Sequence, residues 1–279
     1  MPLIDELKLS RRLQVTARLV FDTAWRIGTG KEGITSSDLG VLLDPVGKPV
    51  LPGSSLKGRL RGTCEGLAHA LNRTACFLNV SASGVNCVSD VEYYRQVKEE
   101  HTAAVRSGDP QELLRWINAH SCDVCKLFGS PTRAARLRCA DGQLETQDAA
   151  VVQVRDGVVL DRDSHTAVPR LKYDYEVLPA LTSFRIRFDL ENANDTDEAL
   201  FGAAMFEWSA GGSLGGFTSR GLGRFHLEDV KVFGVNLEDP KERVAYLTTT
   251  DPAKRLRDRG DWKTYFTGKI ESASQGGES

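Results

Sequence analysis

The sequence predicts an α+β fold in which two helices alternate with the strands of one sheet. Three segments alternate apolar with polar residues, the period of a half-buried strand: Leu13–Phe21, Phe184–Leu190 and Phe225–Phe233. Two further segments have helical signals, and a fourth strand is predicted at Ala149–Val154. The resulting order, strand, helix, strand, strand, helix, strand, is typical of a ferredoxin-like fold.

The first helix is predicted to open at the segment Pro52-Gly-Ser-Ser, because serine is a good N-cap residue. Four leucines then recur at helical spacing and predict one buried face: Leu56, Leu60, Leu67 and Leu71. A glycine-rich stretch, residues 27–40, precedes it and predicts a long loop whose backbone can approach a ligand closely.

A helical insertion is predicted at residues 73–128, because the composition changes there and strand-like material lies on both sides. We expect two helices in it, Val91–Arg106 and Pro110–Ala119, the second with Asp109 as N-cap and proline at its first position. The fold class is therefore α+β with a helical insertion in the sheet-forming part.

The next segment, residues 155–181, predicts a protruding β-hairpin, with Asp156-Gly157 as its turn. Asp195 and Glu198 fit a capping box ahead of the second helix. Beyond Asp251 the chain becomes polar and charged, which predicts a tail whose end, Ser272–Ser279, is disordered.

These elements divide the chain into six segments. They are 1–72, the first half of the sheet-and-helix unit; 73–128, the insertion; 129–154, a strand region; 155–181, the hairpin; 182–250, the second half of the sheet-and-helix unit; and 251–279, the polar tail.

Composition limits the classes of partner. The 279 residues carry a net charge of −2, so any nucleic-acid contact must come from local basic patches rather than from the field of the whole protein. No apolar run has the length of a membrane span, and Met1–Arg12 lacks the apolar region of a secretory signal. We expect no membrane partner, a cytoplasmic location and reduced cysteines.

The start of the first helix is basic and is a candidate for binding phosphate. The exposed N–H groups and positive dipole end of a helix suit an anion. The residues expected to take part are Gly53, Ser54, Ser55, Lys57, Arg59 and Arg61. The order Gly-Lys-Ser/Thr of a nucleotide-binding P-loop is missing, and a solvated, capped helix remains the alternative.

A second glycine-rich segment, Gly211–Gly223, holds six glycines around a single arginine. It lacks the helix that follows a dinucleotide-binding loop. The segment predicts either a flexible surface loop or a backbone that lies close to a ligand. The candidate ligand-binding residues are Gly215, Gly216, Ser219, Arg220 and Gly221.

The cysteines predict a structural zinc site. Cys122 and Cys125 have the spacing of half a tetrahedral site, and Cys76 and Cys87 lie in the same insertion and are the expected partners. The reserve ligands are Cys64, His69 and His120, although Cys64 has the helical position of a core residue. Buried thiols without a metal are the alternative.

Asp38 lies in the first glycine-rich loop. A carboxylate there can hold a metal ion or accept a proton from a ribose 2′-hydroxyl. On its own this signal is weak, because most loop aspartates are solvated or cap a turn.

Four motifs in the same order resemble those of RAMP proteins, the backbone subunits of type III CRISPR effector complexes. The first is Leu51-Pro-Gly-Ser-Ser-Leu-Lys-Gly-Arg-Leu-Arg61, and the second is Cys122-Asp-Val-Cys-Lys-Leu-Phe-Gly129. The third is Arg155-Asp-Gly-Val-Val-Leu-Asp-Arg162 with Tyr175-Glu-Val-Leu-Pro179, and the fourth is Ser219-Arg-Gly-Leu-Gly223. The resemblance extends over roughly residues 12–235.

The resemblance implies an RRM-like palm, a zinc-binding insertion and a hairpin thumb that displaces one base pair of a guide–target duplex. Asp38 precedes Asp44-Pro45 by six residues, which is similar to the spacing of the catalytic aspartate in family members that cut RNA. Asp38 would then be catalytic, with magnesium or manganese, and would leave a 2′,3′-cyclic phosphate.

The implied partners are CRISPR RNA, complementary target RNA, other copies or paralogues of the family and further effector subunits. Arg133 and Arg136 are added as RNA-binding candidates. The alternatives are a catalytically silent scaffold and a stand-alone zinc-containing protein that binds single-stranded RNA.

Overall fold

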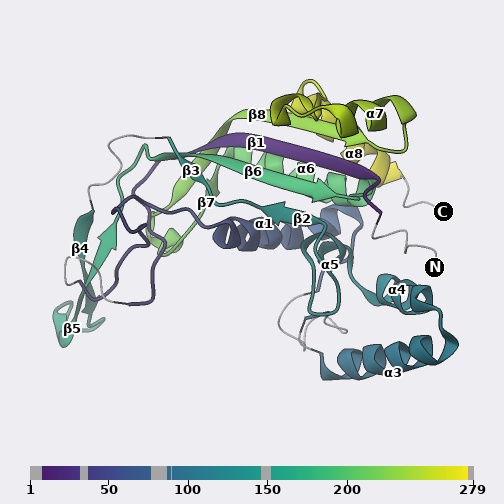
Figure 1. The fold of residues 1–279 in the computed structure, drawn as a ribbon. Coiled ribbons are helices and arrows are strands. Elements are labelled where there is room, and N and C mark those ends of the chain that lie inside the picture. Colours follow the sequence, from purple (N-terminus) through teal and green to yellow (C-terminus); the bar gives the residue numbers. More distant parts are fainter. Residues whose placement is uncertain (1–7, 32–36, 77–86, 89, 146–151, 276–279) are drawn as a thin grey trace.

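The computed structural model describes residues 8–31, 37–76, 87–88, 90–145 and 152–275. Its main sheet is antiparallel, with neighbouring strands in the order β2-β6-β1-β8-β7 (Figure 1). The strands are β1 (Arg11–Phe21), β2 (Leu137–Cys139), β3 (Gln143–Leu144), β6 (Ser183–Glu191), β7 (Gly212–Ser213), β8 (Arg224–Asn236) and β9 (Arg257–Asp258). β3 pairs with β6, and β9 pairs with β8.

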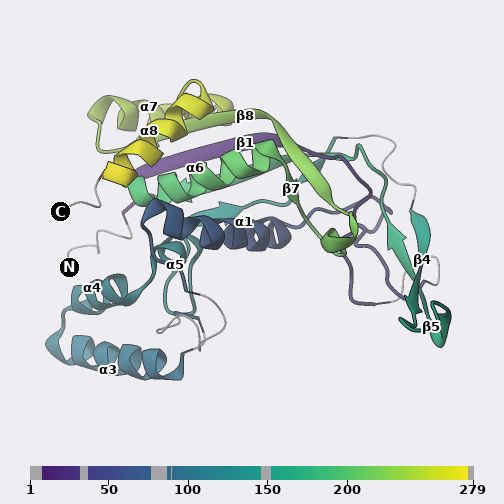
Figure 2. The ribbon, with the colours of Figure 1, turned by 180° about the vertical axis from the view of Figure 1, so that it is seen from behind.

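Two helices, α1 (Gly53–Ala68) and α6 (Asp195–Ala210), cover one face of this sheet (Figure 2). The chain order β1, α1, β2, β6, α6, β8 confirms the α+β class and the predicted ferredoxin-like succession. One strand was misplaced. The second strand is β2, at 137–139; of the segment predicted at 149–154, residues 149–151 lie outside the described residues, and 153–154 begin β4.

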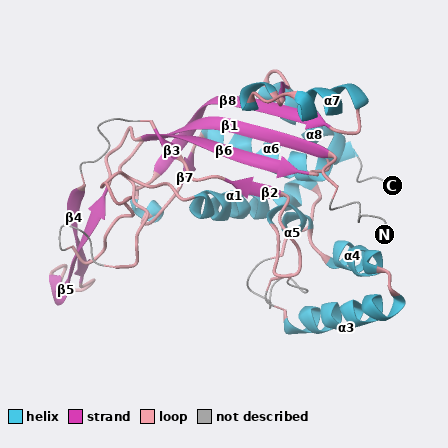
Figure 3. Cartoon of the chain, viewed as in Figure 1, coloured by secondary structure: helices cyan, strands magenta, loops and turns pink. Residues whose placement is uncertain are grey.

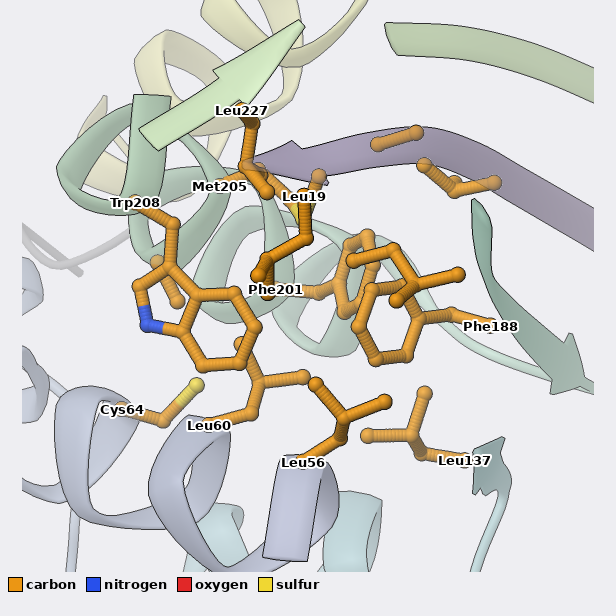
Figure 4. Close-up of a cluster of buried hydrophobic side chains, with 14 of the residues drawn as sticks. Leu19, Leu56, Leu60, Cys64, Leu137, Phe188, Phe201, Met205, Trp208 and Leu227 are labelled. Carbon is orange, nitrogen blue, oxygen red and sulfur yellow. The ribbon is translucent and has the colours of Figure 1, made fainter. Parts of the chain in front are cut away.

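The core lies between the sheet and the two helices. The alternating residues of β1 and β6 point into it, opposite Leu56 and Leu60 of α1 and Phe201 and Trp208 of α6 (Figure 4). Cys64 is fully buried among them, as its helical position predicted. Burying one such large apolar side chain stabilises the fold by about 1.5–3 kcal/mol.

The hairpin forms a sheet of its own, made of β4 (Gln153–Leu160) and β5 (Ala167–Val177), and projects from one end of the main sheet (Figure 3). The Asp156-Gly157 turn was predicted wrongly. Gly157 pairs with Tyr173 inside the ladder, and a Cβ on Gly157 would lie 2.3 Å from that ring. The glycine therefore makes room for a cross-strand aromatic residue, and the chain reverses after Asp161 instead.

The insertion contains α3 (Val91–Ser107) and α4 (Pro110–His120), which confirms both predicted helices and the Asp109 cap. A third helix, α5 (Asp123–Phe128), follows them. Val124, Leu127 and Phe128 belong to the main core. The predicted boundary at residue 128 is therefore too late, because α5 already packs with the palm.

Two local predictions fail in the last third of the chain. Asn194 and Asp197 form the capping box of α6, in place of Asp195 and Glu198. The segment 251–279 is no polar tail, because α8 (Trp262–Gln275) packs on α6 and buries Phe266 completely. Of the end predicted as disordered, residues 272–275 belong to α8 and 276–279 lie outside the described residues. The remaining elements are α7 (Pro240–Thr248) and the short 3-10 turns η2 (His69–Leu71), η3 (Thr218–Arg220) and η4 (Pro252–Lys254).

Candidate functional site

The first glycine-rich loop lies against the base of the hairpin. The Asp174 N–H donates to Asp38 Oδ2 at 2.9 Å, and Leu39 forms a parallel bridge with Tyr175. The Asp38 side chain is exposed. The structure thus presents this carboxylate to solvent beside the strand β5 while one of its oxygens is held by the backbone.

Arg26 contacts several segments of this region, although no sequence motif marks it. Its side chain is 6% exposed, and its NH2 group donates to the carbonyls of Leu39 and Gly40 at 3.2 and 3.3 Å. The guanidinium also lies 5.1 Å from the Phe217 ring centre and 5.8 Å from that of Tyr175. Arg26 therefore contacts the first loop, the second glycine-rich loop and the hairpin at once.

Glu176 is a fully buried carboxylate on β5 and supports the same arrangement. Its Oε2 accepts the Val41 N–H at 2.9 Å. Burial lowers the pKa of Arg26, and the nearby charge of Glu176 offsets part of that shift. A buried charge is costly unless it is compensated, and here each charged side chain bonds to backbone groups of residues 39–41 and so holds the loop in place.

Three aromatic rings and a second arginine line the outer side of this junction. Phe217 packs edge-on against Tyr175 with ring centres 4.9 Å apart, and Tyr173 lies next to both. Arg220 lies 4.8 Å from the Phe217 ring and donates to the Tyr173 hydroxyl at 2.5 Å. The second glycine-rich loop is thus joined to the hairpin through its candidate arginine.

The glycines of the second loop have packing roles. Gly215 has a φ of +96°, and a Cβ there would lie 2.1 Å from the Arg26 carbonyl oxygen. The neighbouring Gly216 N–H donates to that same oxygen at 2.9 Å. Gly221 also has a positive φ, of +85°, in an open turn beside the exposed Ser219. The close approach inferred for this backbone is therefore an approach to Arg26.

The start of α1 is capped by a residue that lies far from it in the sequence. The Gly53 N–H donates to Asp141 Oδ1 at 2.7 Å, and Gly53 packs so tightly that a Cβ would lie 2.4 Å from the Cys139 carbonyl oxygen. Cys139 itself is the last residue of β2. An aspartate therefore already lies at the helix end where an anion was expected.

The polar residues of the first two turns differ in exposure. Ser54 and Arg59 are exposed, whereas Ser55 and Lys57 are half-buried. Burial lowers the pKa of Lys57. Only part of the predicted phosphate-binding set is thus fully presented to solvent.

The other basic candidates are engaged within the protein. Arg61 donates to Glu65, to the Gly129 carbonyl and to Cys125 Sγ. Arg136 pairs with the buried Asp197 at 2.5 Å. Arg133 pairs by its backbone with Ser130. These contacts keep the side chains of Arg61 and Arg136 partly buried.

The four predicted cysteines lie together. The Sγ atoms of Cys76, Cys87, Cys122 and Cys125 are all within 4.8 Å of one another, and Cys76 and Cys125 are 3.5 Å apart. Four sulfur donors at such separations fit one tetrahedral zinc ion. The reserve ligands lie outside this group, since Cys64 is in the main core and the His120 ring bonds the Trp116 carbonyl.

Hydrogen bonds within the cluster favour thiolates at two positions. Bonds with Cys122 and Cys125 lower the pKa of Cys76 and lower that of Cys87 to about 7. A bond with Cys122 raises the pKa of Cys125. Since a metal binds the thiolate form, the cluster is chemically suited to a metal ion such as zinc.

In a comparison with protein-family models, residues 18–226 match the model of the RAMP superfamily. The chain belongs to the RAMP superfamily. No curated protein matches the chain. RAMP membership suggests a CRISPR-associated role in RNA binding, and some RAMP proteins are ribonucleases.

The sheet face opposite the helices differs from that of an RRM, which stacks RNA bases on aromatic residues of its central strands. On this face of the central strands β1 and β6, the RAMP protein has three arginines that pair with acidic neighbours: Arg18, Arg185 and Arg187. The aromatic rings lie at the hairpin base instead. Among the described residues, no helix combines the length and apolar character of a membrane span.

Proposed function

We propose that this protein is a CRISPR-RNA-binding backbone subunit of a type III interference complex, and that it cuts complementary target RNA. The observation that carries the proposal is the convergence of three segments at the hairpin base. Arg26 contacts the loop of Asp38 and the second glycine-rich loop, and both loops touch β5. A carboxylate, two arginines and three aromatic rings thus meet beside a projecting hairpin.

In this proposal the guide is held by contacts to its sugar–phosphate backbone, which position RNA without reading its sequence. Ser54, Ser55, Lys57 and Arg59 supply them at the start of α1, and Ser219 and Arg220 supply them from the second loop. Pairing with the target supplies the sequence specificity. The modest net charge of −2 fits a subunit that contributes a small basic patch to a multi-subunit assembly.

The hairpin is the proposed thumb. Its strands leave apolar side chains in contact with water, which is unfavourable. Five of them are 43–57% exposed: Val154, Val158, Val159, Leu160 and Leu171. Such side chains suit insertion between stacked bases. The thumb would push one base pair out of the guide–target duplex and leave the target strand bent next to Asp38.

Cleavage would follow from that bend. The ribose 2′-hydroxyl loses its proton to Asp38 and attacks the adjacent phosphorus, the bond to the 5′-oxygen breaks, and a 2′,3′-cyclic phosphate and a 5′-hydroxyl form. A magnesium or manganese ion would supply charge stabilisation, and a water molecule would supply the proton for the leaving 5′-oxygen. Asp174, whose pKa is raised by its hydrogen bond with Asp156, is the neighbouring carboxyl group.

The four cysteines are the proposed site of a structural zinc ion. The expected partners are the guide, the target RNA, further copies or paralogues of the family and other effector subunits. Zinc would fix the insertion, whose helices α3 and α4 lie at the end of the palm opposite the hairpin (Figure 1).

The test is target cleavage by the complex assembled on its guide RNA, with magnesium present. We expect the wild type to cut complementary RNA at regular intervals and Asp38→Ala to bind it without cutting. Asp229→Asn, which removes an exposed carboxylate from β8, is the matched control and should cut normally. Intact target with the wild type, or equal cutting by Asp38→Ala, would remove the enzymatic part of the proposal.

A catalytically silent scaffold is the second candidate, and one observation favours it. Asp38 Oδ2 already accepts the Asp174 N–H, so this carboxylate also fixes its own loop. In that case the wild-type complex would bind target RNA and leave it whole.

A further inference from the structure

Arg61 is held from three sides at the junction of α1 and α5. Its Nε donates to Glu65 Oε1 at 2.8 Å, one terminal nitrogen donates to the Gly129 carbonyl at 3.2 Å, and the other donates to Cys125 Sγ at 3.1 Å. The side chain is 25% exposed. Its neighbour Arg59 points outward from the same helix and is exposed.

The sulfur contact places a permanent cation against the cysteine cluster. Four thiolates around one divalent ion carry a net charge of −2, and that charge must be balanced in a partly buried place. Backbone N–H groups help, since Cys122 N–H donates to Cys87 Sγ at 3.3 Å and Cys125 N–H to Cys122 Sγ at 3.4 Å. The Arg61 contact is a charge-assisted bond and therefore the stronger kind.

We propose that Arg61 is a positioning residue of the zinc centre and that its guanidinium, bridging Cys125 Sγ and the Gly129 carbonyl, holds the last cysteine of the centre against α1. The inference rests on the proposed zinc site and assigns Arg61 to the metal in place of the RNA. It needs the arginine fork, because the two acceptors are bound by two separate terminal nitrogens at a fixed spacing, which the single nitrogen of lysine does not reproduce.

The bridge also explains how α5 serves two partners. Val124, Leu127 and Phe128 face the main core, while Cys125 faces the cluster. Gly129 ends the helix with a φ of +86°, and a Cβ there would lie 2.9 Å from Ala135 N. Arg61 binds the sulfur within this helix and the carbonyl at its end, and so fixes its rotation about its own axis.

The experiment uses the purified full-length chain and the metal alone. Arg61→Met keeps much of the apolar stem and loses the donors, and Arg59→Met is the matched control one half-turn away. Zinc affinity is measured by competition with a chelator. We expect Arg61→Met to lose about 10-fold or more, the usual effect of removing an outer hydrogen-bond partner, and Arg59→Met to match the wild type.

Cobalt(II) gives the readout that a general loss of packing would not move. Removing a donor from a thiolate raises the energy of its lone pairs, so the sulfur-to-cobalt charge-transfer band of Arg61→Met should shift to longer wavelength. The ligand-field bands of tetrahedral cobalt should stay. A zinc affinity equal to that of Arg59→Met, with an unchanged band, would overturn the inference.

Two further outcomes of this experiment also decide the inference. If Arg61→Met does not fold, Arg61→Lys replaces it and should still bind zinc more weakly than the wild type, with a shifted band; wild-type behaviour of that variant would refute the bridge. If the wild-type chain itself gives no thiolate–cobalt band, the proposed zinc site fails and the inference fails with it. Neither result depends on RNA.

Discussion

The two ends of the molecule are held together in different ways. At the hairpin end, a buried arginine and a buried carboxylate bond to backbone groups of the adjoining loops, and aromatic rings pack around them. At the insertion end, the second buried cluster consists of Cys76, Cys87 and Cys125 with Val88 and Cys122 packed against it. The hairpin end is held by side-chain, backbone and ring contacts within the protein, whereas the insertion end brings together four sulfur atoms in the arrangement of a metal site.

This contrast indicates where each end is vulnerable. The hairpin end should depend on single side chains whose loss leaves a buried partner unsatisfied. The insertion end should depend on the metal ion that we propose for its four cysteines.

The largest effect is expected from replacing Cys122 and Cys125 together by serine. The variant lacks two of the four proposed ligands and should therefore lose the metal. Because zinc binding contributes about 10–16 kcal/mol to the folding of small zinc domains, hydrogen exchange in α3 and α4 should become fast. Protection in β1, β6 and β8 should persist. Metal analysis should find about one zinc per wild-type chain and none in the variant.

Cys139→Ser is the control for that experiment, since Cys139 lies in β2 outside the cluster. It should keep its zinc. A fully folded wild type without any metal would refute the contrast between the two ends.

The next effect concerns Arg26→Met, which removes the buried link between loop and hairpin. A misplacement of about 1 Å can lower a rate 10²-fold, so target cleavage should fall by about that factor while zinc content stays the same. Guide binding should change less than cleavage, because the proposed phosphate contacts at the start of α1 do not involve Arg26. Single-turnover cleavage and metal analysis of the same preparation measure both.

Arg243→Met serves as its control, because Arg243 is exposed on α7. The cleavage rate of Glu176→Gln should lie between those of Arg26→Met and Arg243→Met, since glutamine keeps the shape of the side chain and loses its charge. Cleavage by Arg26→Met at the wild-type rate would contradict the role given to this arginine.

A smaller effect is expected for the proposed phosphate contacts. Lys57→Ala and Arg59→Ala should each weaken binding of all RNA sequences alike and lower the slope of log affinity against log salt by about 0.7, the value per contact for single strands. Zinc content should not change. An unaltered salt slope in both variants would remove the start of α1 from the RNA-binding surface.

The smallest effect is a pH dependence at the hairpin end. A hydrogen bond to Glu228, and then one to Asp22, raise the pKa of His226 above its ordinary 6.5. Charged His226 therefore favours the folded state below pH 6.5, and this contribution disappears as the pH rises through the folded pKa. His226→Gln should flatten the change in unfolding temperature over that range. An NMR titration of His226 at or below 6.5 would contradict it.

The sequence allowed much of the fold to be predicted because local signals agree with it. Alternation in β1 and β6 and leucine spacing in α1 placed the core, and the Cys122–Cys125 spacing located the cluster that the structure assembles. The cluster could be predicted from the sequence because all four cysteines lie in or beside one insertion.

Other features depend on contacts distant in sequence. Nothing local marks Arg26 as the link between two loops, because its partners at 39, 175 and 217 come together only in the fold. Gly157 carries a turn signal, yet it lies in a strand to admit Tyr173. The apolar stripe of α8 is sparse, so a charged sequence concealed a helix that packs on α6.

The most direct test of the central claim is to sequence the RNA that co-purifies with this chain from cells that carry its whole gene neighbourhood. The account predicts short transcripts derived from a CRISPR repeat array, protected by the complex. A complex that forms without any repeat-derived RNA would contradict it.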